Sequence, residues 1–206
     1  TSPDKADMVL NTAYGQMIDP GTFFYNEGLS ENAYAGRGDQ NGVMSISSGV
    51  YDPSLSRLDD EWKFHYAGIK TSNTLLENIG RIPGMSENLS NRMVAEARFL
   101  RAFHYFYLAT WFGAVPLITK TISVAESPTV ARTSRSEVIA FVLKELDDAE
   151  AALPVNTDYS GNDIGRISKG AAIALKARMN LYESNWTAVA TECEKLISGT
   201  GNGSYS

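Results

Sequence analysis

The sequence has little cysteine, little histidine and no excess of basic charge, and each shortage excludes a class of function. Its 206 residues include one cysteine, Cys193, and two histidines, His65 and His104. One cysteine excludes an internal disulfide framework and a thiolate metal cluster. The two histidines do not form an HxxxH or HExxH pattern, which a metal-binding helix would need. We therefore expect neither metal catalysis nor a cofactor.

The charge and the hydrophobic pattern exclude two further classes. The sequence carries 18 basic and 24 acidic residues, a net charge of -6, without long runs of either sign. It therefore lacks the basic surface that binds a phosphate backbone, and we expect no nucleic acid partner. No segment approaches 18 uninterrupted apolar residues, and the first ten, TSPDKADMVL, lack the pattern of a signal peptide. With 43% hydrophobic residues, a chain of this length can still bury a real core.

Hydrophobic periodicity predicts six helices and no convincing sheet. Capping signals mark several helix starts, among them Ser2 followed by Pro3, and the capping box of Ser134 and Glu137. After Phe112, Gly113 suits a left-handed cap and Pro116 forces an extended exit. The first predicted helix starts at Pro3. The next three cover residues 58–79, the segment from after Ser86 or Ser90 to Phe112, and residues 134–153. The last two cover residues 169–183 and a segment that starts after Asn185.

The last two predicted helices form an antiparallel hairpin over residues 168–198, because only a short turn separates them. Their alanine-rich packing positions are typical of tetratricopeptide (TPR) hairpins. The fold class predicted is therefore all-α, with TPR-like helical hairpins in an α-α superhelix and long irregular loops.

Residues 19–56 form a very long predicted loop, rich in Gly, Asn, Asp, Ser and Tyr, with no lasting period. Loops of this length in compact domains are usually functional or disordered, and the interleaved aromatics argue against disorder. Sugars are bound by aromatic faces together with planar polar side chains, and the loop supplies this mixture. The alternative, to which we give equal weight, is that these residues only form exposed turns. The candidate ligand-binding residues are Asn32, Tyr34, Arg37, Asp39, Gln40, Asn41 and Tyr51.

One segment resembles the signature of a known family. Residues 95–117 read AEARFLRAFHYFYLATWFGAVPL, an aromatic-rich helix with a Gly-x-VPL exit. Weaker matches follow in the same order as in the family, at 62–79, 131–154 and 165–186. The sequence resembles the SusD/RagB-type nutrient-binding lipoproteins of the Gram-negative outer membrane. Ala114 stands where an acidic residue is common, a departure that we interpret as harmless.

The resemblance implies a non-catalytic, lipid-anchored protein of the outer membrane surface. Such proteins bind a glycan, starch-like or otherwise, or a related nutrient, and deliver it to a SusC-like TonB-dependent transporter. Family members are far longer, so residues 1–206 look like the N-terminal helical portion, without the C-terminal remainder. The lipidated N-terminal Cys of the family is also missing, which suggests that the sequence starts after it and that membrane contact is through that anchor alone.

Charged residues in the aromatic segment invite a catalytic interpretation, but ion pairing accounts for them better. A charge on a buried helix must be paired, so we expect Glu96, Arg98 and Arg101 to be structural ion pairs and His104 to be a satisfied core histidine. Neighbouring carboxylates within the acidic run at 59–61, or within the run at 147–150, point in different directions on a helix. Neither run alone can place two carboxyls across a cleft as a glycosidase requires, and we expect both runs to be solvated. Cys193 is expected to be a buried structural thiol.

Two rival functions remain open from the sequence. One is a TPR-type adaptor for peptides or proteins, which leaves the long aromatic loop unexplained. The other is an all-helical glycoside hydrolase, which no feature of the sequence requires.

Overall fold

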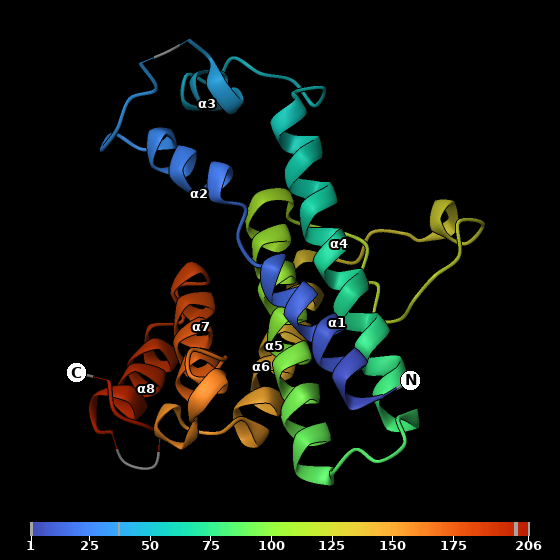
Figure 1. Ribbon diagram of the computed structural model, residues 1–206. Coiled ribbons are helices and arrows are strands. Elements are labelled where there is room, and N and C mark those ends of the chain that lie inside the picture. The colour runs from blue at the N-terminus through green and yellow to red at the C-terminus, as the bar shows by residue number, and fades with distance from the viewer. Residues whose placement is uncertain (1, 37, 200–201, 206) are drawn as a thin grey trace.

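The computed structural model describes residues 2–36, 38–199 and 202–205, and eight α-helices fall within them (Figure 1). No strand occurs in these ranges; Val115 and Thr133 form an isolated antiparallel bridge. The all-α fold class is therefore confirmed. The helices are α1 (Pro3–Gly15), α2 (Pro20–Asn26), α3 (Val43–Ser47), α4 (Ser56–Asn78), α5 (Glu87–Phe112), α6 (Arg135–Ala152), α7 (Lys169–Tyr182) and α8 (Trp186–Ile197).

Most helix starts follow the capping signals of the sequence. The Ser2 hydroxyl accepts the Lys5 N–H before α1, and the capping box of Ser134 and Glu137 opens α6. Ser168 and Asn185 occupy the cap positions of α7 and α8 without a side-chain cap bond. Serine and asparagine at such positions are expected to cap through their side chains, but these two do not, and the Ser168 hydroxyl lies 3.2 Å from the Tyr205 hydroxyl instead.

The structure corrects two further local predictions. Residues 19–56 are not one continuous loop, because α2 and α3 form inside them. Gly113 has a φ of 72° as expected, but its ψ of -111° lies outside the left-handed helical region. The helix end is still a glycine end, because few other residues adopt that positive φ.

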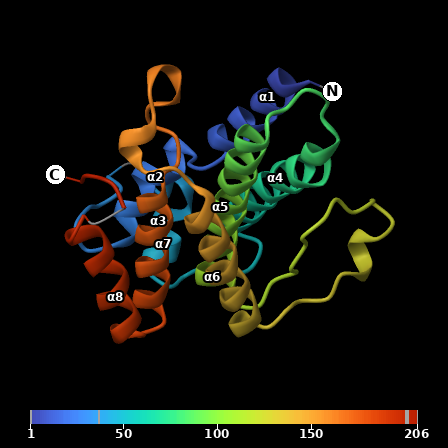
Figure 2. The same cartoon turned by 90° about the horizontal axis from the view of Figure 1, so that it is seen from below.

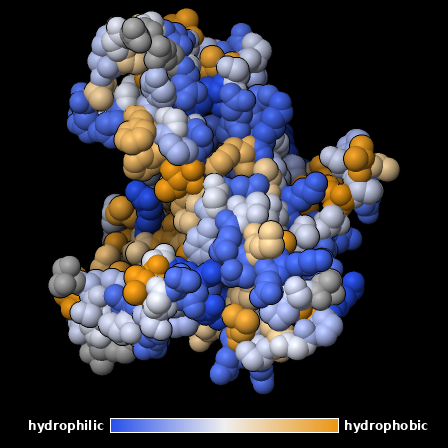
Figure 3. Space-filling model, in the orientation of Figure 1, coloured by the Kyte–Doolittle hydropathy of each residue, from blue (hydrophilic) through white to orange (hydrophobic). Residues whose placement is uncertain are grey.

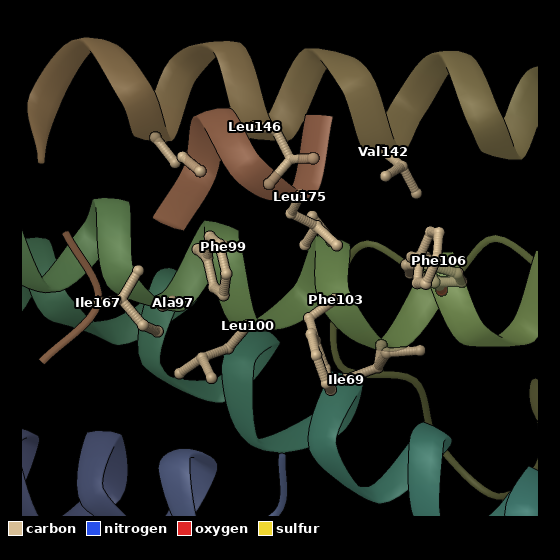
Figure 4. Packing of buried hydrophobic residues seen from close by; sticks show 14 of the residues in the cluster. Ile69, Ala97, Phe99, Leu100, Phe103, Phe106, Val142, Leu146, Ile167 and Leu175 are labelled. Atoms are coloured by element: carbon tan, nitrogen blue, oxygen red, sulfur yellow. The ribbon is translucent and has the colours of Figure 1, made fainter. Parts of the chain in front are cut away.

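Helix α5 is the centre of the molecule. It packs against α4 on one side and α6 on the other, while α1 covers α4 and α5. Helix α7 packs against α6, and α7 and α8 form the predicted antiparallel hairpin (Figure 2). In Figure 4, Val142 and Leu146 of α6 point towards α5, and Ile69 of α4 lies beside Phe103. A helix that is apolar on nearly all sides must be covered by its neighbours, and α5 is covered by α1, α4 and α6.

Charged side chains inside this bundle are paired, as expected. Arg101 donates to Glu145 of α6 through both Nε (2.9 Å) and Nη2 (2.5 Å), and its Nη1 donates to the Asn73 side chain of α4 (2.8 Å). Arg98 pairs with Glu145 at 3.0 Å. These contacts tie three consecutive helices together.

Glu96, with an exposed fraction of 0%, forms a second buried cluster. Its carboxylate accepts from the Tyr14 hydroxyl of α1 (2.5 Å) and from Arg166 (3.2 Å). Burial raises the pKa of Glu96, while Tyr14 and the two nearby arginines, Arg92 and Arg166, act to lower it. The cluster joins α1, α5 and the segment before α7.

The two histidines form a buried pair in which the Nε2 atom of each ring has no hydrogen-bond partner within the described residues. The Nδ1 atoms of His65 and His104 lie 3.1 Å apart, so one ring donates and the other accepts. His104 Nε2 has no hydrogen-bond partner within the described residues. The expectation of a satisfied core histidine is therefore only half right. The His104 ring also explains why residue 68 is a glycine, because an added Cβ there would lie 1.9 Å from His104 Nε2.

Candidate functional site

The segment from Asp19 to Leu55, here called the loop lobe, sits on the N-terminal end of α4 and contains α2 and α3 (Figure 1). Arg57, with an exposed fraction of 1%, anchors it to α4. Its Nη1 donates to the Asn41 carbonyl (3.2 Å), its Nη2 donates to Asn26 Oδ1, and its Nε donates to Glu61 Oε1 (3.0 Å). One buried guanidinium therefore holds two distant parts of the loop lobe against the helix.

The anchor explains two features of the local sequence. Asn41 and Gly42 have φ values of 55° and 65°, and asparagine and glycine are the residues that adopt this conformation most readily. An added Cβ on Gly42 would lie 3.1 Å from the Arg57 Cβ and crowd Leu55. The Arg57 anchor also corrects the prediction that residues 59–61 are solvated. Asp59 and Asp60 are exposed, but Glu61 is buried and ion-paired with Arg57.

The extended exit after α5 forms a second non-helical feature. Residues 113–134 leave the bundle as an arm that projects from its side, here called the projecting arm (Figure 2). The Tyr66 hydroxyl donates to the Pro116 carbonyl (2.7 Å), and the Tyr105 hydroxyl accepts the Ile118 N–H (2.6 Å). At the far end, the Thr133 N–H donates to the Val115 carbonyl (2.9 Å). The aromatic residues of α4 and α5 thus hold the VPLIT exit in place.

A groove of about 370 Å³ lies where the loop lobe meets α4 and the end of α5. It brings together aromatic rings, since Trp62 and Phe112 meet edge to face with ring centroids 5.2 Å apart. Its acidic residues are Asp52 and Asp59, and no basic residue is among the described residues that line it. We call it the Tyr51 groove, and its lining is Tyr51, Asp52, Pro53, Leu58, Asp59, Trp62 and Phe112.

The carboxylates of the Tyr51 groove are hydrogen-bond acceptors. Asp52 accepts from the Ser54 hydroxyl (2.5 Å) and the Ser54 N–H (2.7 Å), and these bonds lower the pKa of Asp52. Asp59 pairs with Lys63 at 2.5 Å. Neither contact keeps its carboxyl group protonated, whereas the general acid of a hydrolase must be protonated to donate to the leaving group.

A second groove, of about 590 Å³, lies between α4 and the projecting arm. Trp62 lines it too, beside Tyr66, and their ring centroids are 4.9 Å apart. We call it the lysine groove, because its charged residues are Lys63, Lys70 and Lys120. Apolar residues of the arm, including the 91% exposed Val124, complete its far wall; the arm and its hydrophobic residues are visible at the right of Figure 3.

Of the seven residues predicted as ligand-binding, Tyr51 is the one that a described groove contains, and it is 51% exposed. Tyr34 is 79% exposed on the loop lobe. The Asn32 side chain donates to Glu27 (2.9 Å). Arg37 lies outside the described residues, as does the side chain of Gln40. Whether these four bind a ligand stays a prediction.

The remaining two of the seven have structural contacts. Asp39 accepts the Met44 N–H (2.7 Å) and the Ser45 N–H (3.1 Å) at the start of α3, and hydrogen bonds from Ser45 lower its pKa. Asn41 presents its carbonyl to Arg57. Both therefore support the loop lobe, and a role in ligand contact remains a prediction.

The sequence interpretation missed Trp62, Phe112 and the three lysines as groove residues. Trp62 was placed only within the predicted helix over 58–79, and Phe112 only at the end of the helix before the exit. A signal for the lysine groove was present, because Lys63 and Lys70 are seven residues apart on α4 and share a face with Tyr66. Lys120 could not have been added, since only the fold brings the arm to that face.

The described residues show no arrangement typical of a metal centre or a membrane span. They contain no group of three or more His, Cys, Asp or Glu side chains that could hold a metal ion. None of the helices within them is both long and apolar enough to cross a bilayer.

Comparison with known proteins identifies the family. Residues 7–181 match the model of a SusD-like family described as "Starch-binding associating with outer membrane". The chain belongs to the SusD-like family. The resemblance in the aromatic helix and its VPL exit is thereby confirmed, and the family is one of carbohydrate-binding proteins associated with the outer membrane.

Two relatives show how far the SusD-like match extends. SusD-like protein P25 of Formosa agariphila is 28% identical over 91% of this chain and 36% of its own length. The starch-binding protein SusD of Bacteroides thetaiotaomicron is 28% identical over 70% of this chain and 24% of its own. The chain therefore spans about a third or less of the length of these curated relatives.

Solved structures agree on the fold. A SusD-like carbohydrate-binding protein of Bacteroides fragilis has a TM-score of 0.88 and 28% identity, with 97% of this chain and 41% of that chain covered. A laminarin-binding SusD-like protein has a TM-score of 0.83 and 28% identity, over 97% of this chain and 44% of that chain.

Proposed function

We propose that this SusD-like chain is the N-terminal portion of a non-catalytic glycan-binding protein, with the Tyr51 groove as its neutral-sugar site. The observation that carries the proposal is the meeting of Tyr51, Trp62 and Phe112 with two carboxylates in one groove. Aromatic faces bind sugar C–H groups, and carboxylates accept hydrogen bonds from hydroxyls. The volume of the groove lies within the range of small-molecule sites.

The chemistry of the groove favours binding over hydrolysis. A glycosidase needs a carboxylic acid of raised pKa beside the scissile bond. Burial raises the pKa of Glu96, but Glu96 is fully buried between α1 and α5 and lines neither groove. Asp52, which does line the Tyr51 groove, has a lowered pKa.

The experiment is calorimetry of the intact protein against a panel of neutral oligosaccharides, with Tyr51→Ala as the test variant. Removal of an exposed aromatic platform should lower affinity by about two- to tenfold, since a ring contact contributes roughly 0.5–1.5 kcal/mol. Phe24→Ala is the matched control, because Phe24 is 76% exposed and lines neither groove. Tyr34→Ala then shows whether the exposed part of the loop lobe also contributes.

Two results would contradict the proposal. One is that no oligosaccharide of the panel binds. The other is that reducing sugar is released from a bound glycan and the release is lost on mutation of an acidic residue.

We further propose that the protein is lipid-anchored at the cell surface and delivers its glycan to a SusC-like TonB-dependent transporter. The family's association with the outer membrane supports this placement. Protease treatment of whole cells should cleave the protein, and a transporter should co-purify with it from solubilised outer membranes. Protection from the protease in intact cells, or purification without a transporter, would oppose it.

A further inference from the structure

The lysine groove has a charge opposite to that of the whole chain. The sequence has six more acidic than basic residues, yet the groove is lined by three lysines and, among its described lining residues, by no carboxylate. A concave surface of one sign concentrates the field of its charges and raises the local concentration of a ligand of opposite sign.

Two of the three ammonium groups are free of ion pairs in the described part of the chain. Lys63 pairs with Asp59 at 2.5 Å, and both side chains are more than half exposed. No described carboxylate lies within ion-pair distance of Lys70 or Lys120. The acids near Lys120 are Glu77 and Glu126. Glu77 accepts from the Thr121 N–H (2.9 Å) and hydroxyl (2.6 Å), and Glu126 accepts from the Ser123 N–H (2.7 Å) and hydroxyl (2.8 Å). Lys70 and Lys120 can therefore pair with a bound anion without first losing a partner.

The floor of the lysine groove is suited to a sugar ring. Trp62 and Tyr66 lie side by side on α4 and line it, and Tyr66 is held in place by its bond to the Pro116 carbonyl. The Asn73 side chain also lines it, with its Nδ2 donating to the Ile118 carbonyl at 3.0 Å. Rings that are fixed in the free protein lose little conformational entropy when a ligand stacks on them.

We propose that the lysine groove binds an anionic oligosaccharide, one that carries carboxylate or sulfate groups. The sugar rings lie over Trp62 and Tyr66, and the anionic substituents face Lys70 and Lys120. This inference rests on the proposed function, glycan binding. An oligosaccharide is favoured over an acidic peptide because Trp62 lines both grooves, so that one extended glycan can continue from the Tyr51 groove into the lysine groove.

The test is calorimetry of the intact protein with matched pairs of oligosaccharides. Each anionic member, oligouronate or sulfated, is compared with its carboxyl-reduced or desulfated counterpart. The anionic member should bind more tightly, and rising ionic strength should weaken its binding while leaving neutral binding unchanged. The double variant Lys70→Gln/Lys120→Gln should lower anionic affinity roughly tenfold, because each exposed charge contact contributes up to about fivefold.

Three controls separate charge from folding. Lys5→Gln removes an exposed lysine that lines neither groove and should change nothing. Lys70→Arg/Lys120→Arg keeps both charges and should retain most of the anionic affinity. The salt dependence of the unmodified protein remains decisive even if the glutamine double variant does not fold.

The outcomes distinguish the inference from the function on which it rests. If neutral oligosaccharides bind in a Tyr51-dependent manner but anionic ones bind no more tightly, the lysine groove proposal is overturned and the proposed function stands. If no oligosaccharide of either kind binds, both are overturned. Lysine-dependent binding of poly-glutamate without binding of any anionic glycan would assign the groove to an acidic peptide and also overturn the inference.

Discussion

The two grooves share Trp62 but differ in charge and in how their walls are held. The Tyr51 groove has acidic residues, and its outer wall belongs to the loop lobe, which Arg57 anchors. The lysine groove has basic residues, and its outer wall is the projecting arm, which Tyr66, Asn73 and Glu77 of α4 hold. A single helix, α4, thus lines two grooves of opposite charge whose outer walls are held by different interactions. Some of the changes that follow affect one groove alone, and others affect residues or packing on which both grooves depend.

The largest effect is expected from Arg57→Met, which removes the anchor of the Tyr51 groove. The change leaves Glu61 buried without its guanidinium and frees the Asn26 and Asn41 contacts. Loss of one partner of a buried pair costs about 3–5 kcal/mol. Denaturant unfolding should show this loss, and calorimetry should show neutral-glycan affinity falling more than anionic affinity.

The control for this change is Arg135→Met, which breaks a partly exposed pair with Glu183. An exposed pair contributes at most about 1 kcal/mol, so the control should remain near the stability of the unmodified protein. Equal destabilisation by both variants would show that Arg57 is not a special anchor.

Acid should weaken the molecule through the histidine pair under the loop lobe. Burial, and next the neighbouring His65, lower the pKa of His104 from 6.5 to about 3. A depressed histidine pKa means that the folded form binds its proton less readily than the unfolded form. The stability contribution is therefore complete above pH 6.5 and is lost as the pH falls from 6.5 towards 3, by about 2 kcal/mol at pH 5.

Denaturant unfolding at pH 7 and pH 5 measures this loss, and His104→Gln should remove much of the difference. His65→Gln serves as the second variant, because either change breaks the imidazole pair. An unchanged difference in both variants would assign the acid sensitivity to the carboxylates.

Trp62→Ala tests whether the grooves share a wall. Because Trp62 lines both, the variant should lower neutral and anionic affinity alike, about tenfold each for the loss of one aromatic platform. Calorimetry with one neutral and one anionic oligosaccharide is the measurement. A loss confined to one ligand class would show that Trp62 contributes to binding in only one of the two grooves.

The smallest expected effect is that of Asp59→Asn, and it has opposite signs in the two grooves. Asp59 lines the Tyr51 groove, and its partner Lys63 lines the lysine groove. The change replaces one charged acceptor oxygen by an amide NH2 group, which weakens acceptance from sugar hydroxyls, and it frees a lysine. Neutral affinity should fall, and anionic affinity should rise, by about two- to threefold each. Changes of the same sign in the two titrations would show that this pair does not couple the grooves.

The long helices could be predicted from the sequence, because each carries several turns of periodic apolar residues and a start signal. Helices α2 and α3 could not, since seven and five residues are too few for periodicity to emerge. The sequence indicated the loop as a candidate site, which stays a prediction, and Tyr51 is the predicted residue that lines a described groove. Its partners Trp62 and Phe112 escaped notice because their helical periodicity indicated only burial. Which rings stay half-exposed at a groove depends on contacts between distant segments, which a local pattern does not contain.

The bridge between Val115 and Thr133 has an evolutionary consequence. It clasps the projecting arm at its base, so the chain between these two residues can change in length and sequence while the helices keep their packing. The entropic cost of closing a loop rises only slowly with its length, so insertions there are tolerated well. One wall of the lysine groove can therefore be exchanged without rebuilding the bundle that carries it.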